Sequence, residues 1–279
     1  MGSSNSSNQP PPECCPPGSL PLADDAKSIG ATKPLRGEIV RLGDDKIGTV
    51  RIYSTHPESE QVRGVVIAIH DIFGFGTSRT HHLCDELANE GYLVVAPCFY
   101  GEDLMPVSGW FSAFTNSRRA LGRVRYPWAK VSPKLDLVMN YIKTETAYAE
   151  LKVGLVGFCW GSWAVFHACA SDQFSCGASF HPSLNLTLVH GESLQALCEN
   201  VKSPQLLMPA FPDPGSVREN GKVINILRKK DFGDQCMVKD FSKQVNHGFA
   251  NRGDLNKTKI ATAYEEGMDL VKTFFKSHL

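Results

Sequence analysis

The sequence predicts an α/β protein built around a mostly parallel, doubly wound β-sheet. Short apolar runs, which suit strands buried on both faces, occur at residues 65–69, 93–96, 153–156, 178–180 and 205–208. Stretches with apolar residues at helical spacing lie at 79–91, 132–147, 160–171 and 255–278. Strands that alternate with helices form right-handed crossovers, and such a sheet binds its ligand beyond the carboxyl ends of the strands. We therefore expect the functional residues in the loops that follow the apolar runs.

Two different segments precede the first apolar run. Residues 1–35 are rich in Ser, Asn and Pro and hold few apolar side chains, which predicts a loosely attached tail in front of a single domain at 36–279. From residue 37, apolar residues alternate with polar ones in two runs separated by Gly43-Asp44-Asp45. This pattern predicts an antiparallel hairpin at the start of the domain.

The beginning of the chain matches a loose pattern for a lipid anchor. Met-Gly-Ser-Ser-Asn-Ser fits the signal for myristoylation at Gly2, and Cys14 and Cys15 could carry a second acyl chain. A Ser-rich start matches so short a pattern easily, so membrane attachment is expected only if Gly2 is myristoylated. The stretch has no basic start followed by an apolar run, so it does not indicate a secretory signal.

Charge and cysteine content exclude several classes of protein. The chain has 279 residues, with 29 Lys and Arg against 29 Asp and Glu, so it lacks the long-range positive field on which nucleic-acid binding depends. Nine cysteines, an odd number in a chain of this length, are not typical of a disulfide framework. Free thiols in a reducing, cytoplasmic compartment are therefore expected. His81, His82 and Cys84 form the densest set of metal-ligand residue types, but no second pair lies at a recognisable spacing, and no metal is expected.

The most informative motif is Gly157-Phe158-Cys159-Trp160-Gly161, which stands between a strand pattern and a helix pattern. In a nucleophile elbow the two glycines let strand and helix approach closely around a nucleophile, and N–H groups at the helix start face the oxyanion that forms. Cysteine stands here in the place of the usual serine, and a thiol is the better nucleophile near neutral pH. The sequence therefore predicts that Cys159 is a catalytic nucleophile, whereas the other cysteines of the domain are expected to act as small buried hydrophobic residues.

A nucleophile elbow also predicts the chain order nucleophile, acid, histidine. Asp213 follows the apolar run 205–208 in a turn-rich loop, and His247 follows a strand expected near 236–241, just before the last helix. We therefore expect Asp213 to orient His247, which acts as the base. Three other carboxylates in the same part of the chain could reach the same ring, namely Asp231, Asp234 and Asp240.

Two main-chain N–H groups are candidates for an oxyanion hole. In α/β-hydrolases one of them comes from the loop after the first buried strand and the other from the residue after the nucleophile. The glycine-rich loop 70–76 and the motif around Cys159 therefore nominate the N–H groups of Ile72 and Trp160. The alternative is that the loop is a glycine-rich turn with no catalytic task.

Five segments together resemble one family, the dienelactone hydrolases, which are cysteine-dependent members of the α/β-hydrolase fold. In the expected order over residues 37–279 they are His70-Asp71-Ile72-Phe73-Gly74, Phe99-Tyr100-Gly101, Gly157-Phe158-Cys159-Trp160-Gly161, His181-Pro182-Ser183 and His247-Gly248-Phe249-Ala250-Asn251-Arg252-Gly253-Asp254. The resemblance implies an α/β-hydrolase fold with a triad of Cys159, His247 and Asp213. It also implies action on esters or lactones, with no metal or organic cofactor.

The resemblance further implies roles for residues around the triad. Asp71 stands where bacterial members carry a glutamate, and by resemblance it holds the resting thiol through a hydrogen bond, with a side chain one methylene shorter. Arg252 and Tyr100 are implied to contact the substrate, although Arg252 lies one place later after the histidine than in the bacterial pattern. Residues 101–133 either cover the site with aromatic walls and an anion-binding arginine or form a solvated face. The side chains concerned are Trp110, Phe111, Phe114, Arg118, Arg119, Arg123, Arg125, Tyr126 and Trp128.

The sequence thus predicts a hydrolase that cleaves an ester or lactone through an acyl-enzyme on Cys159. Two alternatives remain. One is a binding or redox-sensing protein on the same scaffold, in which Cys159 does not turn over, and the other is a thioesterase or peptidase with the same triad. The expected partner is a small ester or lactone, with or without a free carboxylate, and not a nucleic acid. Neither the physiological substrate nor the oligomeric state follows from the sequence.

Overall fold

The structure, a computed structural model, describes residues 19–20, 34–44, 48–59, 61–74, 79–100, 122, 124–144 and 148–279. The candidate acylation sites Gly2, Cys14 and Cys15 lie outside the described residues. So do most residues of the predicted cover over the site, namely Trp110, Phe111, Phe114, Arg118, Arg119 and Arg123.

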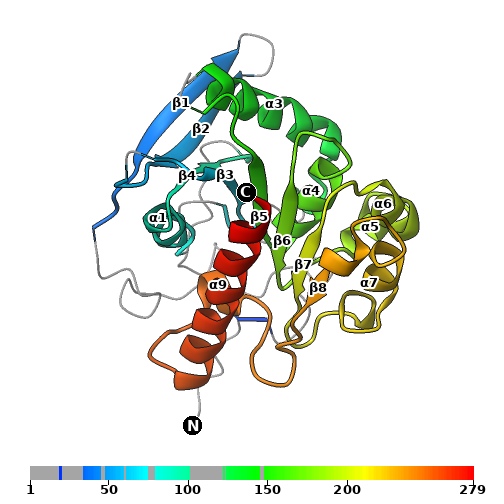
Figure 1. The fold of residues 1–279 in the computed structure, drawn as a ribbon. Helices are drawn as coiled ribbons and strands as arrows, with labels where there is room; N and C mark the ends of the chain where they lie inside the picture. The colour runs from blue at the N-terminus through cyan, green and yellow to red at the C-terminus, as the bar shows by residue number, and fades with distance from the viewer. Residues whose placement is uncertain are drawn as a thin grey trace.

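One eight-stranded sheet forms the centre of the molecule, in the order β1-β2-β4-β3-β5-β6-β7-β8 (Figure 1). Its strands are β1 (Glu38–Asp44), β2 (Gly48–Thr55), β3 (Gly64–Ile69), β4 (Tyr92–Pro97), β5 (Val153–Phe158), β6 (Cys176–Phe180), β7 (Gln205–Met208) and β8 (Met237–Val238). β1 pairs with β2, and β2 with β4, in antiparallel fashion, whereas the other neighbours are parallel. The predicted class, a mostly parallel sheet with an antiparallel hairpin at its start, is confirmed.

Helices connect the strands and cover both faces of the sheet. Their bounds are α1 (Thr80–Asn89), α3 (Trp128–Thr144), α4 (Trp160–Ala168), α5 (Leu186–Val189), α6 (Leu194–Asn200), α7 (Lys222–Leu227), α8 (Phe249–Arg252) and α9 (Thr258–His278), with the 3₁₀ turns η1 (Gly215–Val217) and η2 (Gly233–Gln235). α3 begins at Trp128 rather than at residue 132, and the Trp128 ring stacks on His167 of α4 with 5.0 Å between centroids. The sequence does not predict α5 to α8, because so few residues show no helical periodicity.

Alternation along the buried strands divides the core into two halves. Val65, Ile67 and Ile69 of β3 pack on the side of α3, α4, α6 and α7, whereas Val66 and Ala68 pack on the side of α1 and α9 (Figure 1). Every residue of the strands from β3 to β7 is buried. Burial on both faces explains why these strands appear in the sequence as unbroken apolar runs.

The described cysteines other than Cys159 fill space in this core. Within the described residues, six cysteines form no disulfide and are buried, namely Cys84, Cys98, Cys169, Cys176, Cys198 and Cys236. Burial raises the pKa of the Cys169 thiol to about 11 and that of Cys198 to about 12, so both stay protonated at neutral pH. As predicted, they pack as small hydrophobic groups.

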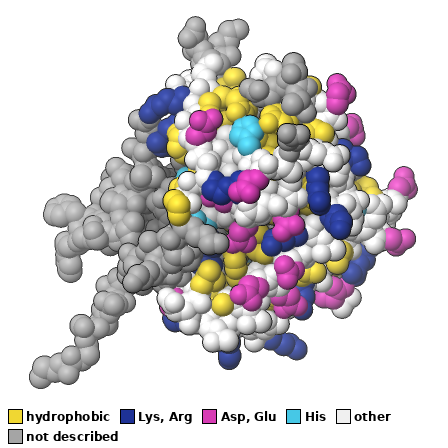
Figure 2. Space-filling view, turned by 60° about the vertical axis from the view of Figure 1, so that its left-hand side comes forward, with side chains coloured by type: hydrophobic (Ala, Val, Ile, Leu, Met, Phe, Trp, Pro, Cys, Tyr) yellow, Lys and Arg dark blue, Asp and Glu magenta, His cyan; other side chains and the backbone are white. Residues whose placement is uncertain are grey.

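The described surface carries charges of both signs. Figure 2 shows Lys and Arg side chains interspersed with Asp and Glu on the face that it presents. Exposed ion pairs join some of them, such as Lys202 with Asp172 at 2.8 Å and Arg228 with Glu219 at 2.7 Å. No helix in the described ranges is long and apolar enough to cross a bilayer.

Candidate active site

Cys159 lies in a strained turn between the end of β5 and the start of α4. Its φ of 55° and ψ of −112° place a non-glycine residue where glycine is favoured, which is the strained geometry expected at a nucleophile elbow. A Cβ on Gly157 would lie 2.6 Å from the carbonyl carbon of Gly161, and one on Gly161 would lie 2.7 Å from the carbonyl oxygen of His70. Only glycine fits at these two positions, so the motif forms the predicted strand, turn and helix.

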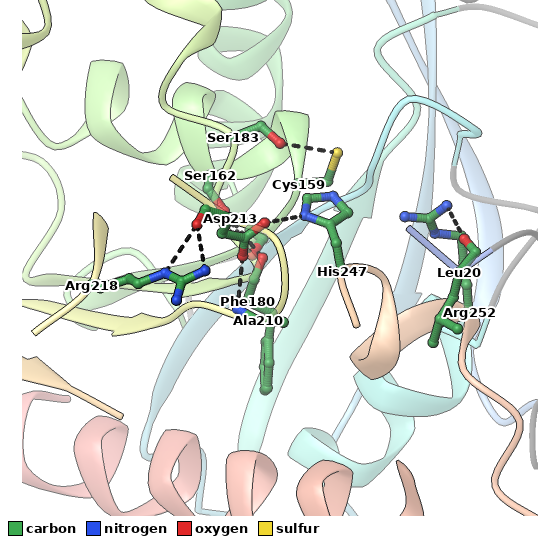
Figure 3. A network of polar contacts seen from close by, with 11 residues as sticks. Leu20, Cys159, Ser162, Phe180, Ser183, Ala210, Asp213, Arg218, His247 and Arg252 are labelled. Atoms are coloured by element: carbon green, nitrogen blue, oxygen red, sulfur yellow. Dashed lines mark hydrogen bonds and ion pairs between the residues drawn. The ribbon is translucent and has the colours of Figure 1, made fainter. Parts of the chain in front are cut away.

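His247 and Asp213 form a buried pair beside this turn (Figure 3). Nδ1 of His247 lies 2.6 Å from Oδ1 of Asp213, and both side chains are buried. The second carboxylate oxygen of Asp213 accepts a hydrogen bond from the Ala210 N–H at 2.8 Å. Arg218 donates to the Asp213 carbonyl through Nε at 3.0 Å and Nη2 at 2.8 Å. The Ala210 bond fixes the carboxylate, the Arg218 bonds fix the main chain that carries it, and the carboxylate fixes the orientation of the imidazole ring.

The structure distinguishes Asp213 from the other three carboxylates that the sequence left open. Asp231 and Asp234 are exposed. Asp240 uses its carboxylate to accept the Ser242 N–H at 2.8 Å. Of the four candidates, Asp213 is the one that the structure places against the imidazole of His247.

The protonation of His247 reflects two opposing effects. Burial lowers its pKa, but the charges of Asp213 and Cys159 and the hydrogen bond to Asp213 outweigh burial and raise the pKa to about 9. In Figure 3 the second ring nitrogen lies on the side of Cys159. The site therefore favours the protonated form of the imidazole beside Asp213.

Two residues of the loop after β6 reach the site, although the sequence pattern alone gives them no role. The Ser183 hydroxyl donates to Sγ of Cys159 at 3.4 Å, and the Ser183 N–H donates to the Cys159 carbonyl at 3.2 Å (Figure 3). The ring of His181 lies 4.6 Å from that of His247, and burial together with the nearby charges of His247 and Arg252 holds the pKa of His181 well below its usual range. The pairing of β5 with β6 is the signal that could have indicated a role for this loop in the site, because neighbouring parallel strands end at the same edge of the sheet.

Asp71 is buried against partners other than the thiol. Its Oδ2 accepts a hydrogen bond from Asn251 Nδ2 at 2.8 Å and lies 3.0 Å from Nε of Arg252, and its Oδ1 accepts the Phe73 N–H at 2.9 Å. Burial raises the pKa of Asp71, the Arg252 guanidinium opposes this effect, and Cys159 adds to it. Ser183 donates a hydrogen bond to Sγ, and a direct bond from Asp71 to the thiol stays a prediction.

Arg252, expected to contact the substrate, is 1% exposed. Besides facing Asp71, its guanidinium donates through Nη1 to the carbonyl of Leu20 at 2.7 Å and lies over the ring of Phe73, 4.7 Å from its centroid. The structure therefore engages Arg252 with a carboxylate, a main-chain oxygen and an aromatic ring. Its contact with substrate stays a prediction.

The two candidate oxyanion N–H groups come from neighbouring segments. β3 and β5 pair in parallel up to Ile69 and Gly157, so the loop with Ile72 and the start of α4 lie at the same edge of the sheet. Trp160 is the first residue of α4, and the first N–H groups of a helix have no partner within the helix. His70 anchors the loop, because its Nε2 accepts the Phe99 N–H at 3.2 Å and its Nδ1 therefore carries the proton donated to the Asp71 carbonyl at 2.6 Å.

Aromatic rings surround this edge of the sheet. The ring of Tyr100 lies 4.9 Å from His70, 5.0 Å from Trp160 and 5.7 Å from Tyr126, measured between centroids. Of the described residues in the predicted cover, Tyr126 thus joins an aromatic wall, whereas Arg125 is exposed. Contact of Tyr100 with substrate remains a prediction.

The histidines and cysteine at the start of α1 do not form a metal site. His81 stacks on Tyr53 with 4.2 Å between ring centroids, and burial lowers its pKa to about 4. Throughout the described part of the chain, no three His, Cys, Asp or Glu residues are grouped so that they could hold a metal ion.

Comparisons with known proteins point to one family. A model of the dienelactone hydrolase family matches residues 50–279. Hydrolase pyvD from Aspergillus violaceofuscus is 26% identical over 275 residues, which cover 97% of this chain and 98% of that protein. A carboxymethylenebutenolidase homolog from Rattus norvegicus is 28% identical over 208 residues, which cover 73% of this chain and 77% of that protein. The crystal structure of a dienelactone hydrolase from Anabaena variabilis has the same fold, with a TM-score of 0.58 at 14% identity over 88% of this chain and 99% of that one.

Proposed function

The chain belongs to the dienelactone hydrolase family, and on this basis we propose that it cleaves a carboxylic ester or lactone with Cys159 as the nucleophile. The observation that carries the proposal is the buried pair of His247 and Asp213, 2.6 Å apart, beside a cysteine in a strained turn between strand and helix. A nucleophile, a base within reach and a third group that orients the base are the recurring parts of covalent acyl transfer.

The proposed reaction has two halves. In the first, the Cys159 thiolate attacks the carbonyl carbon of the substrate, and the resulting oxyanion lies against the N–H groups of Ile72 and Trp160. The intermediate collapses, the C–O bond breaks, and the His247 imidazolium gives its proton to the leaving alkoxide. In the second half, water attacks the thioester while neutral His247 takes its proton, and the Cys159 thiolate leaves as the carboxylic acid forms.

Two neighbours adjust the charges during this cycle. Asp213 stabilises the imidazolium that exists at rest and again after water attacks. Ser183 donates a hydrogen bond to the sulfur, and a hydrogen bond to a charged acceptor favours the thiolate over the thiol. Both groups are buried, where such interactions are stronger than in water.

The relatives and the walls of the site support a proposal for the substrate class. The name of the rat relative denotes a butenolide, so we propose an unsaturated lactone of this type as the first substrate to test. The aromatic rings of Tyr100 and Trp160 favour a planar or apolar acyl group. Because oxidation would remove the thiolate, we also propose that the protein acts in a reducing compartment.

The test compares the wild type with Cys159→Ala on activated aryl esters and on butenolides, and follows the protein by intact mass spectrometry. The wild type should turn over and carry a transient acyl adduct, while the variant should fold and do neither. Turnover by Cys159→Ala would refute the nucleophile. A stable adduct or an oxidised thiol without product would favour the binding or redox-sensing alternative. A preference for thioesters or peptides over oxygen esters would favour a thioesterase or peptidase.

A further inference from the structure

Two residues of the predicted tail lie against the catalytic histidine. The N–H of Leu20 donates to the carbonyl of His247 at 2.8 Å. The carbonyl of Leu20 accepts a hydrogen bond from Nη1 of Arg252 at 2.7 Å (Figure 3). A single residue near the N-terminus thus bonds through both of its main-chain groups to residues more than two hundred positions away.

Packing supports these two hydrogen bonds. Ser19 is 7% exposed, and the Leu20 side chain packs, partly buried, against the core cluster that contains Phe249 and Ala250 of α8. The docked dipeptide is therefore held by an apolar contact as well as by polar ones. A tail that only passed over the surface would not bury a serine and pair both main-chain groups of the next residue.

From this geometry we propose that Leu20 is a positioning residue for His247, and that residues 19–20 form an N-terminal clamp on the site. The proposal rests on the proposed function, since it assigns the clamp a role in the reaction that His247 serves. In this proposal the main chain of residues 19–20 keeps the imidazole of His247 correctly positioned between Asp213 and Cys159.

The reason lies in how the main chain of His247 is held. Its N–H donates to the carbonyl of Phe211 at 2.7 Å, which ties it to the loop that carries Asp213. Its carbonyl is held by Leu20. The next residue, Gly248, has a φ of 92° and no side chain to restrict it, so the peptide after His247 is easily reoriented when that carbonyl is released. Leu20 therefore restrains the side of the histidine that the Asp213 loop does not.

The other end of the clamp acts on Arg252. The guanidinium faces Asp71, which lies in the loop that carries the candidate oxyanion N–H of Ile72. Without the Leu20 carbonyl, the buried guanidinium would lose the acceptor that Nη1 uses at 2.7 Å. Arg252 would then shift, and with it the Asp71 loop. The clamp thus links the histidine loop, through Arg252, to the loop that carries Asp71.

Truncation tests the clamp with a matched control. One variant lacks residues 1–20, and the control lacks residues 1–16 and so keeps Leu20 preceded by its natural neighbours. We expect kcat to fall by about tenfold or more in the first variant, because misplacement of a catalytic group by a fraction of an ångström is enough for such a loss. KM and the urea midpoint should change little, and the control should behave as the full chain. A synthetic peptide of residues 15–26, added to the shorter protein, should restore part of kcat.

Point variants separate the main-chain bonds from the side chain. Leu20→Pro removes the N–H that holds His247, whereas Leu20→Ala keeps it and loses only packing, so the proline variant should lose more kcat. Alkylation of Cys159 by iodoacetamide near pH 6.5 provides a readout that needs no substrate, since it reports the thiolate held by His247. The alkylation of Cys159 should slow in the variant without residues 1–20.

The outcomes are distinct. Unchanged kcat, pH profile and alkylation rate in the variant without residues 1–20 would overturn the clamp. So would a loss of activity that merely follows unfolding and that the peptide does not restore. If the full chain hydrolyses no ester but truncation still slows alkylation, the proposed function fails and the clamp stands.

Discussion

Replacing Asp213 with Asn tests the pairing on which the proposed chemistry depends. The carboxylate has two acceptor oxygens in use, one facing Nδ1 of His247 at 2.6 Å and one facing the Ala210 N–H at 2.8 Å. An amide of the same shape has one oxygen and one NH2 group. If the oxygen stays on the Ala210 N–H, the NH2 faces Nδ1 and forces the proton of neutral His247 onto Nε2, where the ring can no longer accept a proton from the thiol.

The magnitude follows from the protonation of His247. Burial lowers its pKa, and Asp213 is the largest of the influences that raise it to about 9 from an ordinary value of 6.5. That difference is worth about 3 kcal/mol at 1.36 kcal/mol per pKa unit, or roughly 300-fold in the protonation equilibrium. Removing the carboxylate takes away the largest influence that raises the pKa while burial still lowers it, so the imidazolium of His247 is destabilised near neutral pH. We expect kcat/KM to fall by about 10² or more.

Two assays measure this loss. Hydrolysis of an activated aryl ester between about pH 5 and about pH 9 gives the pH profile of kcat/KM. In Asp213→Asn, kcat/KM should fall most at the acid end of this range. Alkylation of Cys159 by iodoacetamide over the same range reports the thiolate directly, and should slow most near neutral pH in the variant.

Asp240→Asn is the matched control. Asp240 lies in the same part of the chain, and among the described residues its carboxylate accepts a local N–H, that of Ser242. Its loss should leave kcat/KM and the alkylation profile as in the wild type. The reasoning would be refuted if Asp213→Asn kept kcat/KM within about threefold of the wild type, since a triad acid contributes far more than that, or if Asp240→Asn caused the larger loss.

Three further predictions concern the thiol, the elbow and the pH dependence of stability. Ser183→Ala should slow alkylation of Cys159 below pH 7 by about threefold to tenfold, because it removes the hydroxyl that donates to Sγ, and Ser183→Thr should recover part of the rate; equal rates in all three proteins would contradict this. Gly161→Ala should lower the free energy of unfolding by about 1–3 kcal/mol or prevent folding, because the added methyl group collides with main-chain atoms at the end of β3. Gly215→Ala, where a Cβ meets nothing within 4 Å, is its control, and similar urea midpoints for the two variants would count against the close approach. Since the folded-state pKa of His247 lies above its ordinary value, its stabilising effect is complete below pH 6.5 and is lost as the pH rises through about 9. Urea midpoints of the wild type should therefore fall over this range, and a His247→Gln variant with the same slope would show that another group is responsible.

Local and periodic features of this protein are visible in the amino-acid sequence. Burial on both faces turns the central strands into apolar runs, and the elbow needs glycine at 157 and 161 because strand and helix touch there. The order in which Cys159, Asp213 and His247 follow their strands is likewise a property of the chain. These signals depend on each residue's immediate neighbours or on a fixed period, so the fold class and the candidate triad could be predicted without coordinates.

Only the tertiary structure decided which groups touch. It selected Asp213 among four carboxylates, placed Ser183 on the thiol, joined Asp71 to Arg252, and docked Leu20 of an apparently loose tail against His247. The physical reason is that a hydrogen bond forms only within a few tenths of an ångström of its ideal distance, between groups that can be far apart along the chain. Such a contact imposes no period and no local composition, and it exists only once the sheet has brought the carboxyl ends of its strands to one edge.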